Sequence, residues 1–352
     1  MISLQTVALA TALAAVLSAV VRLLPGPAAV PVPDRWHRTV TPATGGIALF
    51  FAFVIALQPP LYGGAISGRY EPVVLVAGVA FALGLWDDAR HLTIHHKLAG
   101  QLAIALIAVH EGVRPDWLPA SVGIPVACIV IVGSMNSLNL LDNMDGLAAG
   151  TAAVAALGLA LVGGLVESAG SPVVAAAIAG ACLGFLPFNF RRSRPASLFM
   201  GDSGSQMLGF TLGALALLTS PGGAGGVAAA IVAPLLILAV PALDTGLVML
   251  VRLAEGRPFW QGGRDHSSHR LVYRGFTERR AVAVLLAVTA SCTTTAITLV
   301  IFQNVVLTIV ASAVTLAGLI LFGVRLALST ENGVTQGVPQ TSSRREARAP
   351  VA

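Results

Sequence analysis

Two adjacent aspartates, Asp87 and Asp88, stand at the end of a long apolar stretch of the sequence. Adjacent carboxylates repel each other unless a cation or a proton lies between them. Unpaired charge is also costly where an apolar helix meets the membrane boundary. The pair therefore indicates either a cation-dependent catalytic site or only the end of a membrane span, and by itself it does not separate these interpretations.

A second polar segment, residues 136–146, carries amides and carboxylates at intervals of three residues and ends in glycine. On a helix, Asn136, Asn139 and Asn143 would share one face, as would Asp142 and Asp145. Such side chains offer oxygen ligands to Mg²⁺ and hydrogen bonds to a nucleotide. Helix capping is the simpler interpretation, but one cap needs one residue rather than five, so the functional interpretation is favoured.

The third segment places Asp202 between two glycines, just before a helix that we expect to begin near Ser205. Glycines let the backbone approach a phosphate closely, and the N-terminus of a helix favours anions. An aspartate there would repel a phosphate unless a cation lay between them. The pattern predicts Asp202 as a metal ligand, although alone it would also suit a simple N-cap.

The fourth segment brackets His266 and His269 with Arg264 and Arg270. Arginine side chains can hold phosphoryl oxygens through paired hydrogen bonds, so this segment suits a diphosphate. A solvated basic loop is the alternative, and it explains the arginines better than the histidines. Asp244 lies within an apolar run, where an ionisable residue is a functional candidate.

The surrounding composition is that of a membrane protein. The chain has 352 residues, of which 56% are hydrophobic and 11% charged, whereas about a quarter of an ordinary soluble domain is charged. We predict an all-α bundle of eleven spans, forming a single catalytic domain over 1–329, with a disordered basic tail over 330–352. The spans are expected to begin near Met1, Thr44, Glu71, Leu98, Leu118, Leu147, Ser171, Ser205, Gly226, Ala281 and Asn304.

Basic residues set the expected orientation, because cytoplasmic loops carry an excess of Lys and Arg. With the N-terminus outside, 19 of the 21 basic residues fall inside, and only Arg69 and Arg114 fall outside. The same orientation puts the aspartates of all four segments on the cytoplasmic side. We assign the formal net charge of +5 to these loops rather than to nucleic-acid binding.

Taken together, the segments resemble the polyprenyl-phosphate N-acetylhexosamine-1-phosphate transferase family. The resemblance runs from about Asp34 to Arg280 and begins with Trp36-His37-Arg38 and the segment 42–46. It continues through the paired aspartates, the Asn/Asp segment, the loop 199–205, and the segment around Asp244. Each motif alone is weak, but four of them in order on one membrane face are specific.

One departure concerns the branch of the family. Ser267 and Ser268 stand between the two histidines, so the triple-histidine loop of the UDP-MurNAc-pentapeptide branch is missing. The chain is therefore more similar to the branch that starts O-antigen, teichoic acid or other envelope glycans from UDP-GlcNAc.

The resemblance implies a reaction in which polyprenyl phosphate attacks the β-phosphate of a UDP-sugar at the inner membrane, giving polyprenyl-diphospho-sugar and UMP. It implies Mg²⁺, with Mn²⁺ as an alternative, and leaves a homodimer open. The metal ligands are Asp202 and Asp88. The catalytic candidates are Asp87, Asp88, Asp142, Asp145 and His266. The substrate-binding candidates are Asn136, Asn139, Asn189, Phe199, Gly201, Asp244, Arg264, His269 and Arg270.

Two other classes fit part of the pattern. A transporter would also have many spans, but it should carry polar groups near their middle and often repeated halves, whereas these spans are Ala/Val/Leu-rich. A CDP-alcohol phosphotransferase is also a Mg²⁺-dependent membrane enzyme, but its Asp/Gly/Ala-Arg signature is absent from this sequence. Release of UMP, release of CMP, or solute flux alone would separate the three.

Overall fold

The computed structural model describes residues 2–29, 40–66, 68–166, 170–191, 194–218, 226–258 and 263–328. The predicted opening motif at Trp36-His37-Arg38 lies outside these residues. The predicted tail over 330–352 lies outside them as well.

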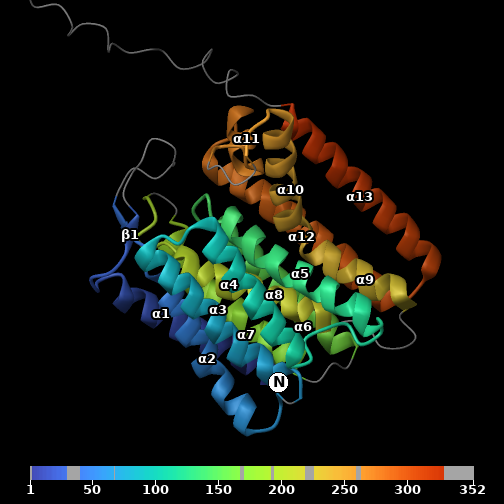
Figure 1. Cartoon of the computed structure of the whole chain (residues 1–352), viewed down its shortest axis with the longest axis horizontal. Coiled ribbons are helices and arrows are strands. Elements are labelled where there is room, and N and C mark those ends of the chain that lie inside the picture. The colour runs from blue at the N-terminus through green and yellow to red at the C-terminus, as the bar shows by residue number, and fades with distance from the viewer. Residues whose placement is uncertain are drawn as a thin grey trace, which may run out of the picture.

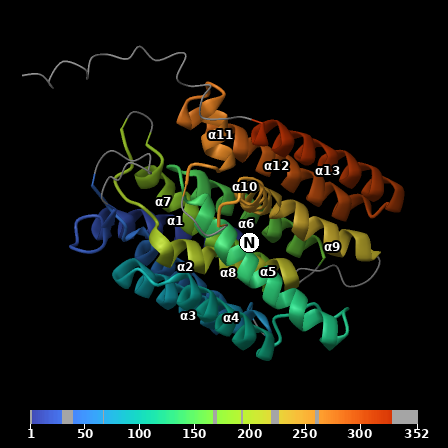
Figure 2. The same cartoon turned by 45° about the horizontal axis from the view of Figure 1, so that its top comes forward.

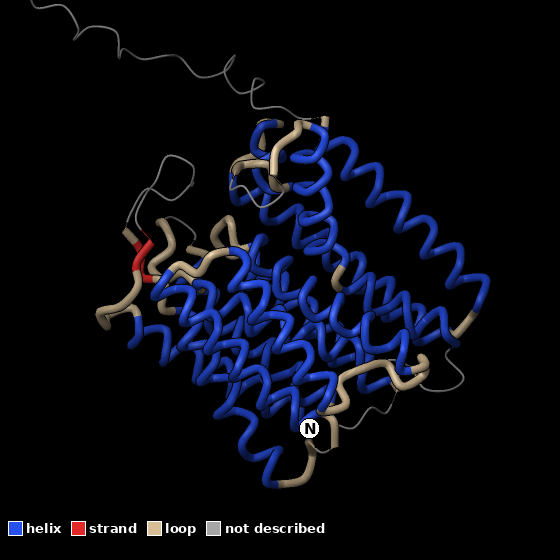
Figure 3. The backbone as a smooth tube through the Cα atoms, in the orientation of Figure 1, coloured by secondary structure: helices blue, strands red, loops and turns tan. Residues whose placement is uncertain are grey.

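Within the described ranges the chain is almost entirely helical, with two very short paired strands (Figures 1 and 3). The strands pair antiparallel, with Ala28 opposite Pro42. The elements are α1 (Ile2–Val21), β1 (Ala28–Ala29), β2 (Thr41–Pro42), α2 (Gly45–Tyr62), α3 (Tyr70–Arg90), α4 (Ile94–His110), α5 (Ala120–Leu141), α6 (Leu147–Leu165), α7 (Ser171–Asn189), α8 (Gly201–Leu218), α9 (Gly226–Ile237), α10 (Ala239–Ala254), α11 (Ser267–Tyr273), α12 (Glu278–Phe302) and α13 (Val305–Ala327).

Helices occur at all eleven predicted positions, so the prediction of an all-α, multi-pass membrane protein is confirmed. Among the described residues, eight helices are each long and apolar enough to cross a membrane. The ninth predicted span is two helices, α9 and α10, bent by 71° where they meet. The helices α4 and α8 lie at the two positions where the apolar runs are shortest, so the count of eleven spans stays a prediction.

The helix α8 is the centre of the main bundle, and α3 and α5 pack along it. Its side chains from Ser203 to Leu218 are all buried, including the polar Gln206 and Thr211. A helix that is covered on all sides does not need an apolar surface against lipid. This explains how α8 can carry polar residues such as Gln206 and Thr211 while still occupying the core.

Glycines allow the neighbouring backbones to approach α8 closely. A Cβ atom at Gly84 of α3 would lie 2.3 Å from the carbonyl oxygen of Asp202, and one at Gly46 of α2 would lie 2.4 Å from Gly204 N. On the other side of α8, a Cβ at Gly209 would lie 2.6 Å from Ser134 O of α5. Small residues at such contacts are how helices pack tightly in membranes.

A second group of helices, α9 to α13, packs beside this bundle (Figures 1 and 2). A smaller apolar core, which includes Val240, Leu271 and Leu285, joins α10, α11 and α12 to the start of α6. The helix α13 lies at the edge of the molecule and is the least buried of the spanning candidates. This second group carries the predicted histidine segment on the short helix α11.

The antiparallel course of the helices gathers the polar segments at one end of the bundle. The carboxyl ends of α3, α5 and α7 meet the amino ends of α4, α6 and α8 there. At the opposite end, Arg69 forms an ion pair with Asp116. Arg69 is one of the two basic residues that we expected outside, and it lies at the end of the bundle opposite the polar segments; the orientation in the membrane stays a prediction.

The approach of α3 to α8 predicts unequal effects for two glycines of the same helix. Gly84→Ala should destabilise the protein by about 1–3 kcal/mol, because the added methyl group would overlap the backbone of α8. Gly78→Ala is the matched control, since its Cβ would meet only the Phe50 ring at 3.6 Å. Thermal unfolding in detergent measures both, and equal midpoints for the two variants would contradict the close-packing account.

Candidate active site

Lys97 stands between acidic and amide groups from three other helices. Its ammonium group, at the start of α4, lies 2.8 Å from Asp87 Oδ2 of α3 and donates to Asn139 Oδ1 of α5 at 2.9 Å. It also lies 3.4 Å from Asp202 Oδ1 of α8. We call Asp87, Lys97, Asn139 and Asp202 the Lys97 cluster.

The cluster explains how neighbouring carboxylates are tolerated at this site. The carboxylates of Asp87 and Asp202 lie within 2.8 and 3.4 Å of the same Lys97 ammonium group, and two such groups repel each other unless a positive charge is near both. Lys97 supplies one positive charge against two negative ones. The Asp202 side chain is 31% exposed and that of Asp87 only 7%, so the remaining negative charge is accessible mainly at Asp202.

Asp88 is turned towards the backbone of α8 rather than into the cluster. Its two carboxylate oxygens accept hydrogen bonds from the N–H groups of Asp202 at 2.7 Å and Ser203 at 3.0 Å. These are donors that a helix leaves unpaired in its first turn. Each oxygen keeps a further lone pair, so the predicted metal contact of Asp88 stays a prediction beside this structural one.

Gly201 makes that arrangement sterically feasible. It has a φ of +74°, in the left-handed region, and a Cβ there would lie 2.8 Å from the Asp88 carboxylate. The helix begins at Gly201 rather than near Ser205 as expected, so Asp202 lies in its first turn. Gly201 thus shapes the start of the helix.

The segment after α5 differs from the sequence expectation. The helix ends at Leu141, and residues 142–146 form a turn, so Asp142 and Asp145 do not share a helix face as we had expected. Asp145 Oδ2 accepts a hydrogen bond from Ala196 N at 3.0 Å. The turn is stabilised by contacts with the loop before α8, which the sequence pattern could not reveal.

Asn189 supports the same loop from the end of α7. Its side chain is 3% exposed, accepts a hydrogen bond from Gly146 N at 2.7 Å, and donates one to Leu198 O at 3.1 Å. The next residue, Phe199, is half-buried, and its carbonyl accepts from Gly45 N at 2.9 Å. Gly45 and Gly46 therefore lie in the first turn of α2, which is docked on this loop, close to the expected start of the second span at Thr44.

A second constellation surrounds Asp244 of α10, whose side chain is completely buried. Asp244 Oδ2 lies 2.8 Å from His266 Nδ1, and Oδ1 accepts from Ser267 N at 2.7 Å and Ser267 Oγ at 2.6 Å. An ionised carboxylate only accepts, so His266 Nδ1 is the donor, which leaves Nε2 for other partners. Asp244 thus orients His266, and the predicted role of Asp244 in substrate binding stays a prediction.

Aspartate and arginine contacts fix the loop before α11. Asp265 accepts hydrogen bonds from Arg252 Nε at 3.1 Å and Arg257 Nη2 at 3.0 Å. Burial opposes ionisation of Asp265, but these two guanidinium groups outweigh it and lower the pKa of the carboxyl below its usual value. Arg252 and Asp265 were not among the predicted site residues.

The two predicted arginines of this segment, Arg264 and Arg270, differ in burial and in their hydrogen-bond partners. Arg270 is 6% exposed and donates to Leu326 O and Ala327 O at the end of α13, at 3.1 and 2.9 Å. Arg264 is half-buried, and its carbonyl accepts from Tyr273 Oη at 3.2 Å. Diphosphate binding by Arg264 and Arg270 stays a prediction; the contacts of Arg270 connect α11 with α13.

His269 is buried beside His266, with ring centroids 5.4 Å apart. Burial lowers the pKa of the His269 imidazole to about 3, and the nearby His266 and Arg264 add to the effect. The ring is therefore neutral at physiological pH. A neutral imidazole offers hydrogen bonds to a phosphate but no charge.

The two constellations are joined through the end of α5. Ser268 Oγ donates to Asn143 Oδ1 at 2.6 Å, and Thr245 Oγ1 donates to Ser137 Oγ at 3.0 Å. Asn143 follows Asn139 of the Lys97 cluster by four residues. The residues around His266 and the Lys97 cluster are therefore connected through the short segment 139–143.

The sequence analysis missed Lys97, although a signal was present. It is the only lysine in a chain with 21 basic residues. A lysine is a compact charge that fits between carboxylates at hydrogen-bonding distance, whereas a guanidinium group is planar and larger. The isolated lysine beside an aspartate pair was therefore informative.

The predicted Mg²⁺ ion fits the chemistry of the cluster. Carboxylate and amide oxygens are the ligands that Mg²⁺ prefers, and this ion commonly takes one or two carboxylates together with waters and ligand phosphates. Among the described residues no three His, Cys, Asp or Glu side chains converge as a complete metal cage. Asp202, as the more exposed carboxylate, is the residue best placed to hold the ion.

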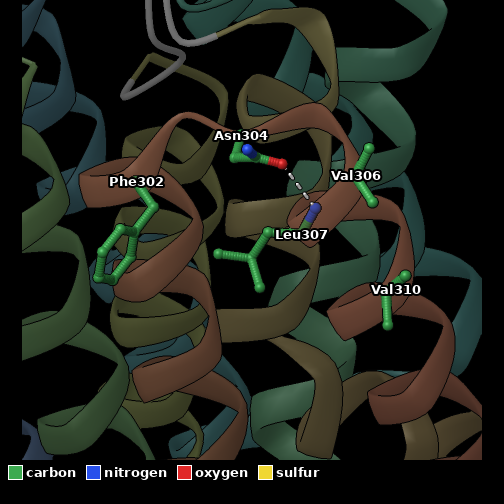
Figure 4. Close-up of a pocket in the computed structure, with 5 residues that line it drawn as sticks. All are labelled: Phe302, Asn304, Val306, Leu307 and Val310. Atoms are coloured by element: carbon green, nitrogen blue, oxygen red, sulfur yellow. Dashed lines mark hydrogen bonds between the residues drawn. The ribbon is translucent and has the colours of Figure 1, made fainter.

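The grooves on the described surface include two that differ in their lining. One, of about 550 Å³, is lined by Trp86, Arg90, Leu92 and His96 and lies beside the Asp87 end of α3. The other, of about 510 Å³, lies at the turn between α12 and α13, where Asn304 caps α13 and apolar side chains surround it (Figure 4). The second has no titratable lining residue, so it offers no groups for acid–base chemistry.

Comparisons with known proteins show the family of the chain. A family model described as "Glycosyl transferase family 4" matches residues 72–220, a range that includes the Lys97 cluster. Decaprenyl-phosphate N-acetylglucosaminephosphotransferase of Mycobacterium tuberculosis is 36% identical over 296 residues, covering 74% of this chain and 72% of the relative. A probable undecaprenyl-phosphate N-acetylglucosaminyl 1-phosphate transferase of Bacillus subtilis is 30% identical, with 72% of each covered.

A phospho-N-acetylmuramoyl-pentapeptide-transferase of Desulforudis audaxviator is 34% identical but covers only 52% of this chain and 64% of the relative. The similarity to the N-acetylglucosamine enzymes therefore extends further along the chain.

The buried neutral His269 predicts a pH-dependent stability. Its folded pKa is about 3, below the value of about 6.5 for an unfolded chain, so the unfolded state binds more protons as the pH falls and stability falls with it. Between pH 7 and pH 5 the wild type should lose about 2 kcal/mol more than His269→Gln, which does not titrate there. Unfolding in detergent measures the difference; parallel pH profiles would contradict a neutral His269.

Proposed function

The chain belongs to glycosyl transferase family 4, and from this premise we propose that it transfers N-acetylglucosamine 1-phosphate from UDP-GlcNAc to polyprenyl phosphate. The similarity to N-acetylglucosamine phosphotransferases over 72% of their length carries the proposal. An oxygen of the lipid phosphate attacks the β-phosphorus of the donor. The bond from that phosphorus to the bridging oxygen breaks, and UMP leaves with the electron pair.

The Lys97 cluster addresses the main barrier, which is the repulsion between two anions. The Lys97 ammonium group would attract phosphate oxygens, and Asp87, which already holds Lys97 at 2.8 Å, would keep it in place. A phosphate monoester is largely ionised at neutral pH. Asp87 is therefore needed to orient the attacking phosphate through Lys97 more than to deprotonate it.

Mg²⁺, or Mn²⁺ in its place, would neutralise the diphosphate of the donor when bound. Asp202 would hold the ion, and Asp88 would assist by fixing the first turn of α8 through the N–H groups of Asp202 and Ser203. Asn139, which donates to Asp202, would keep that carboxylate oriented. These residues come from three helices, so the bundle must be assembled before the ion can bind.

Binding of the donor would involve both constellations. His266, oriented by Asp244, would present Nε2 to a phosphate on the sugar side. Asn139, Asp142 and the loop at Phe199 would surround the nucleotide, with Phe199 stacking on uracil. Asp145 and Asn189 would act through that loop, because Asp145 accepts a hydrogen bond from Ala196 N and Asn189 donates one to Leu198 O.

The location follows from the substrates and the charges. UDP-GlcNAc is soluble and polyprenyl phosphate is a membrane lipid, so the site must lie where the cytoplasm meets the bilayer. The excess of basic residues at the inner loops gives the same orientation. We place the protein in the inner membrane, with its site facing the cytoplasm, at the first membrane step of a cell-envelope glycan.

Removing one charge from the cluster should abolish most of the activity. With UDP-GlcNAc, undecaprenyl phosphate and Mg²⁺, Asp202→Asn and Lys97→Met should each lower kcat about 100- to 1,000-fold. Chelation should stop the wild type, and added Mg²⁺ or Mn²⁺ should restore it. Asp116→Asn, at the opposite end of the bundle, is the control. Near-normal UMP release by correctly folded Asp202→Asn would contradict the metal assignment.

The buried Asp244 should affect turnover through His266. Asp244→Asn keeps the shape but presents an NH₂ group to at least one of three donors. We expect kcat to fall about 10- to 100-fold, because the imidazole loses its fixed orientation. A rise in the KM for UDP-GlcNAc at unchanged kcat would show instead that Asp244 contributes to donor binding.

A further inference from the structure

A second polar layer lies one helical turn deeper than the Lys97 cluster. Gln101 follows Lys97 by four residues on α4, Gln206 follows Asp202 by four on α8, and Asn136 precedes Asn139 by three on α5. Residues three or four apart on a helix lie on the same face. The same three helices therefore contribute one polar side chain to each layer.

Hydrogen bonds join the three deeper side chains, which we call the amide layer: Gln101, Asn136 and Gln206. Gln101 Nε2 donates to Gln206 Oε1 at 2.9 Å and to Asn136 Oδ1 at 3.3 Å. Asn136 Nδ2 donates back to Gln101 Oε1 at 2.7 Å. Gln101 is thus the central member that connects α4 to both α5 and α8.

The layer is not arranged for maximum stability. Gln101 and Gln206 are both 0% exposed, and Gln206 Nε2 has no hydrogen-bond partner within the part of the chain that the structure describes. A buried donor without a partner costs about 1–3 kcal/mol, and an apolar residue of similar size would avoid that cost. An amide at this position therefore calls for a reason other than folding.

The positions of the helices supply the reason. The helix α4 packs along α3 and α5, and its reach to α8 is made by two side-chain bridges, from Lys97 to Asp202 and from Gln101 to Gln206. The deeper bridge lies directly beneath the upper one. It restricts how far α4 can slide or rotate relative to α8, which sets where the Lys97 ammonium group stands relative to the Asp202 carboxylate.

We propose that Gln101, Asn136 and Gln206 are positioning residues that hold Lys97 in register with Asp202. The expected effect of this role on turnover rests on the proposed function. The expected effect on the position of Lys97 does not. It also differs from our sequence expectation for Asn136, which we had predicted to bind substrate. The amide layer would act through the cluster above it and would contact neither substrate.

Gln206→Leu is the most informative variant, because it removes the unpaired donor together with the acceptor for Gln101. Thermal stability should stay the same or rise. The kcat should fall about 10- to 100-fold, with the KM for each substrate nearly unchanged, since a small misplacement of a catalytic group affects turnover first. Gln206→Met serves if the leucine variant does not fold, and Gln101→Leu/Gln206→Leu should show the larger effect.

Lys97 also provides a readout that does not require turnover. As the only lysine, it can be labelled by an amine-reactive reagent and separated from the N-terminal amine by peptide mapping. In Gln206→Leu, Lys97 should be labelled about fivefold faster, which corresponds to about 1 kcal/mol of lost restraint. Thr211→Val is the control, because Thr211 is buried on α8 and donates to Met207 O of its own helix, at 2.8 Å.

The outcomes distinguish the two proposals. Normal kcat and an unchanged labelling rate in stable Gln206→Leu would overturn the positioning role. A kcat that falls only in proportion to folded protein would overturn it too. A wild type that releases no UMP from any UDP-sugar would refute the proposed function, and the labelling rates alone would then decide whether the amide layer positions Lys97.

Discussion

The charge of one lysine underlies the organisation of this site. Asp87 and Asp202 come from different helices, and the Asp87 side chain is buried, where like charges interact more strongly than in water. The Lys97 ammonium group contacts both carboxylates and Asn139 as well. Buried ion pairs contribute little net stability once desolvation is counted. Their presence here is better explained by a site that must receive phosphates and a metal ion than by folding.

Backbone packing positions the charges with respect to one another. Glycines on α2, α3 and α8 allow three helices to meet where Asp88 binds the N–H groups of Asp202 and Ser203 in the first turn of α8. This contact attaches the metal-binding end of α8 to the end of α3 that carries Asp87. The bond from Asn189 to Gly146 and the bond from Ala196 to Asp145 then set the turn and the loop on either side. Several residues with catalytic-looking types therefore serve to align the backbone.

In the α10–α11 region, too, buried charged groups fix the backbone, but the groups are different. A fully buried Asp244 carries a negative charge that His266 and two donors of Ser267 satisfy, and Arg252 and Arg257 fix Asp265 beside them. The loop between α10 and α12 is thereby attached to α10. In a family 4 enzyme this attachment would keep His266 at a constant distance from the Lys97 cluster. A diphosphate donor has to bridge that distance.

Sequence alone determined the class of the protein, because hydrophobic length and the distribution of arginines are properties of the linear chain. The positions of the helices and the polar segments at their ends followed from the same information, and the family resemblance added the reaction. The sequence also identified the residue types of the site, Asp87, Asp88, Asn139, Asp202 and His266 among them. It did not reveal Lys97 as their partner, nor the division between residues that face the cluster and residues that hold the backbone.

Only the tertiary structure decided those partnerships. Asp87 and Asp88 are neighbours in sequence, yet one contacts Lys97 and the other contacts the backbone of α8, because successive side chains on a helix point in directions about 100° apart. Asp142 and Asp145 left the expected helix face because α5 ends at Leu141. Gln101 and Gln206 are 105 residues apart, and no local pattern links them. Packing between distant helices determines which polar groups meet, whereas composition and spacing determine only which polar groups are available.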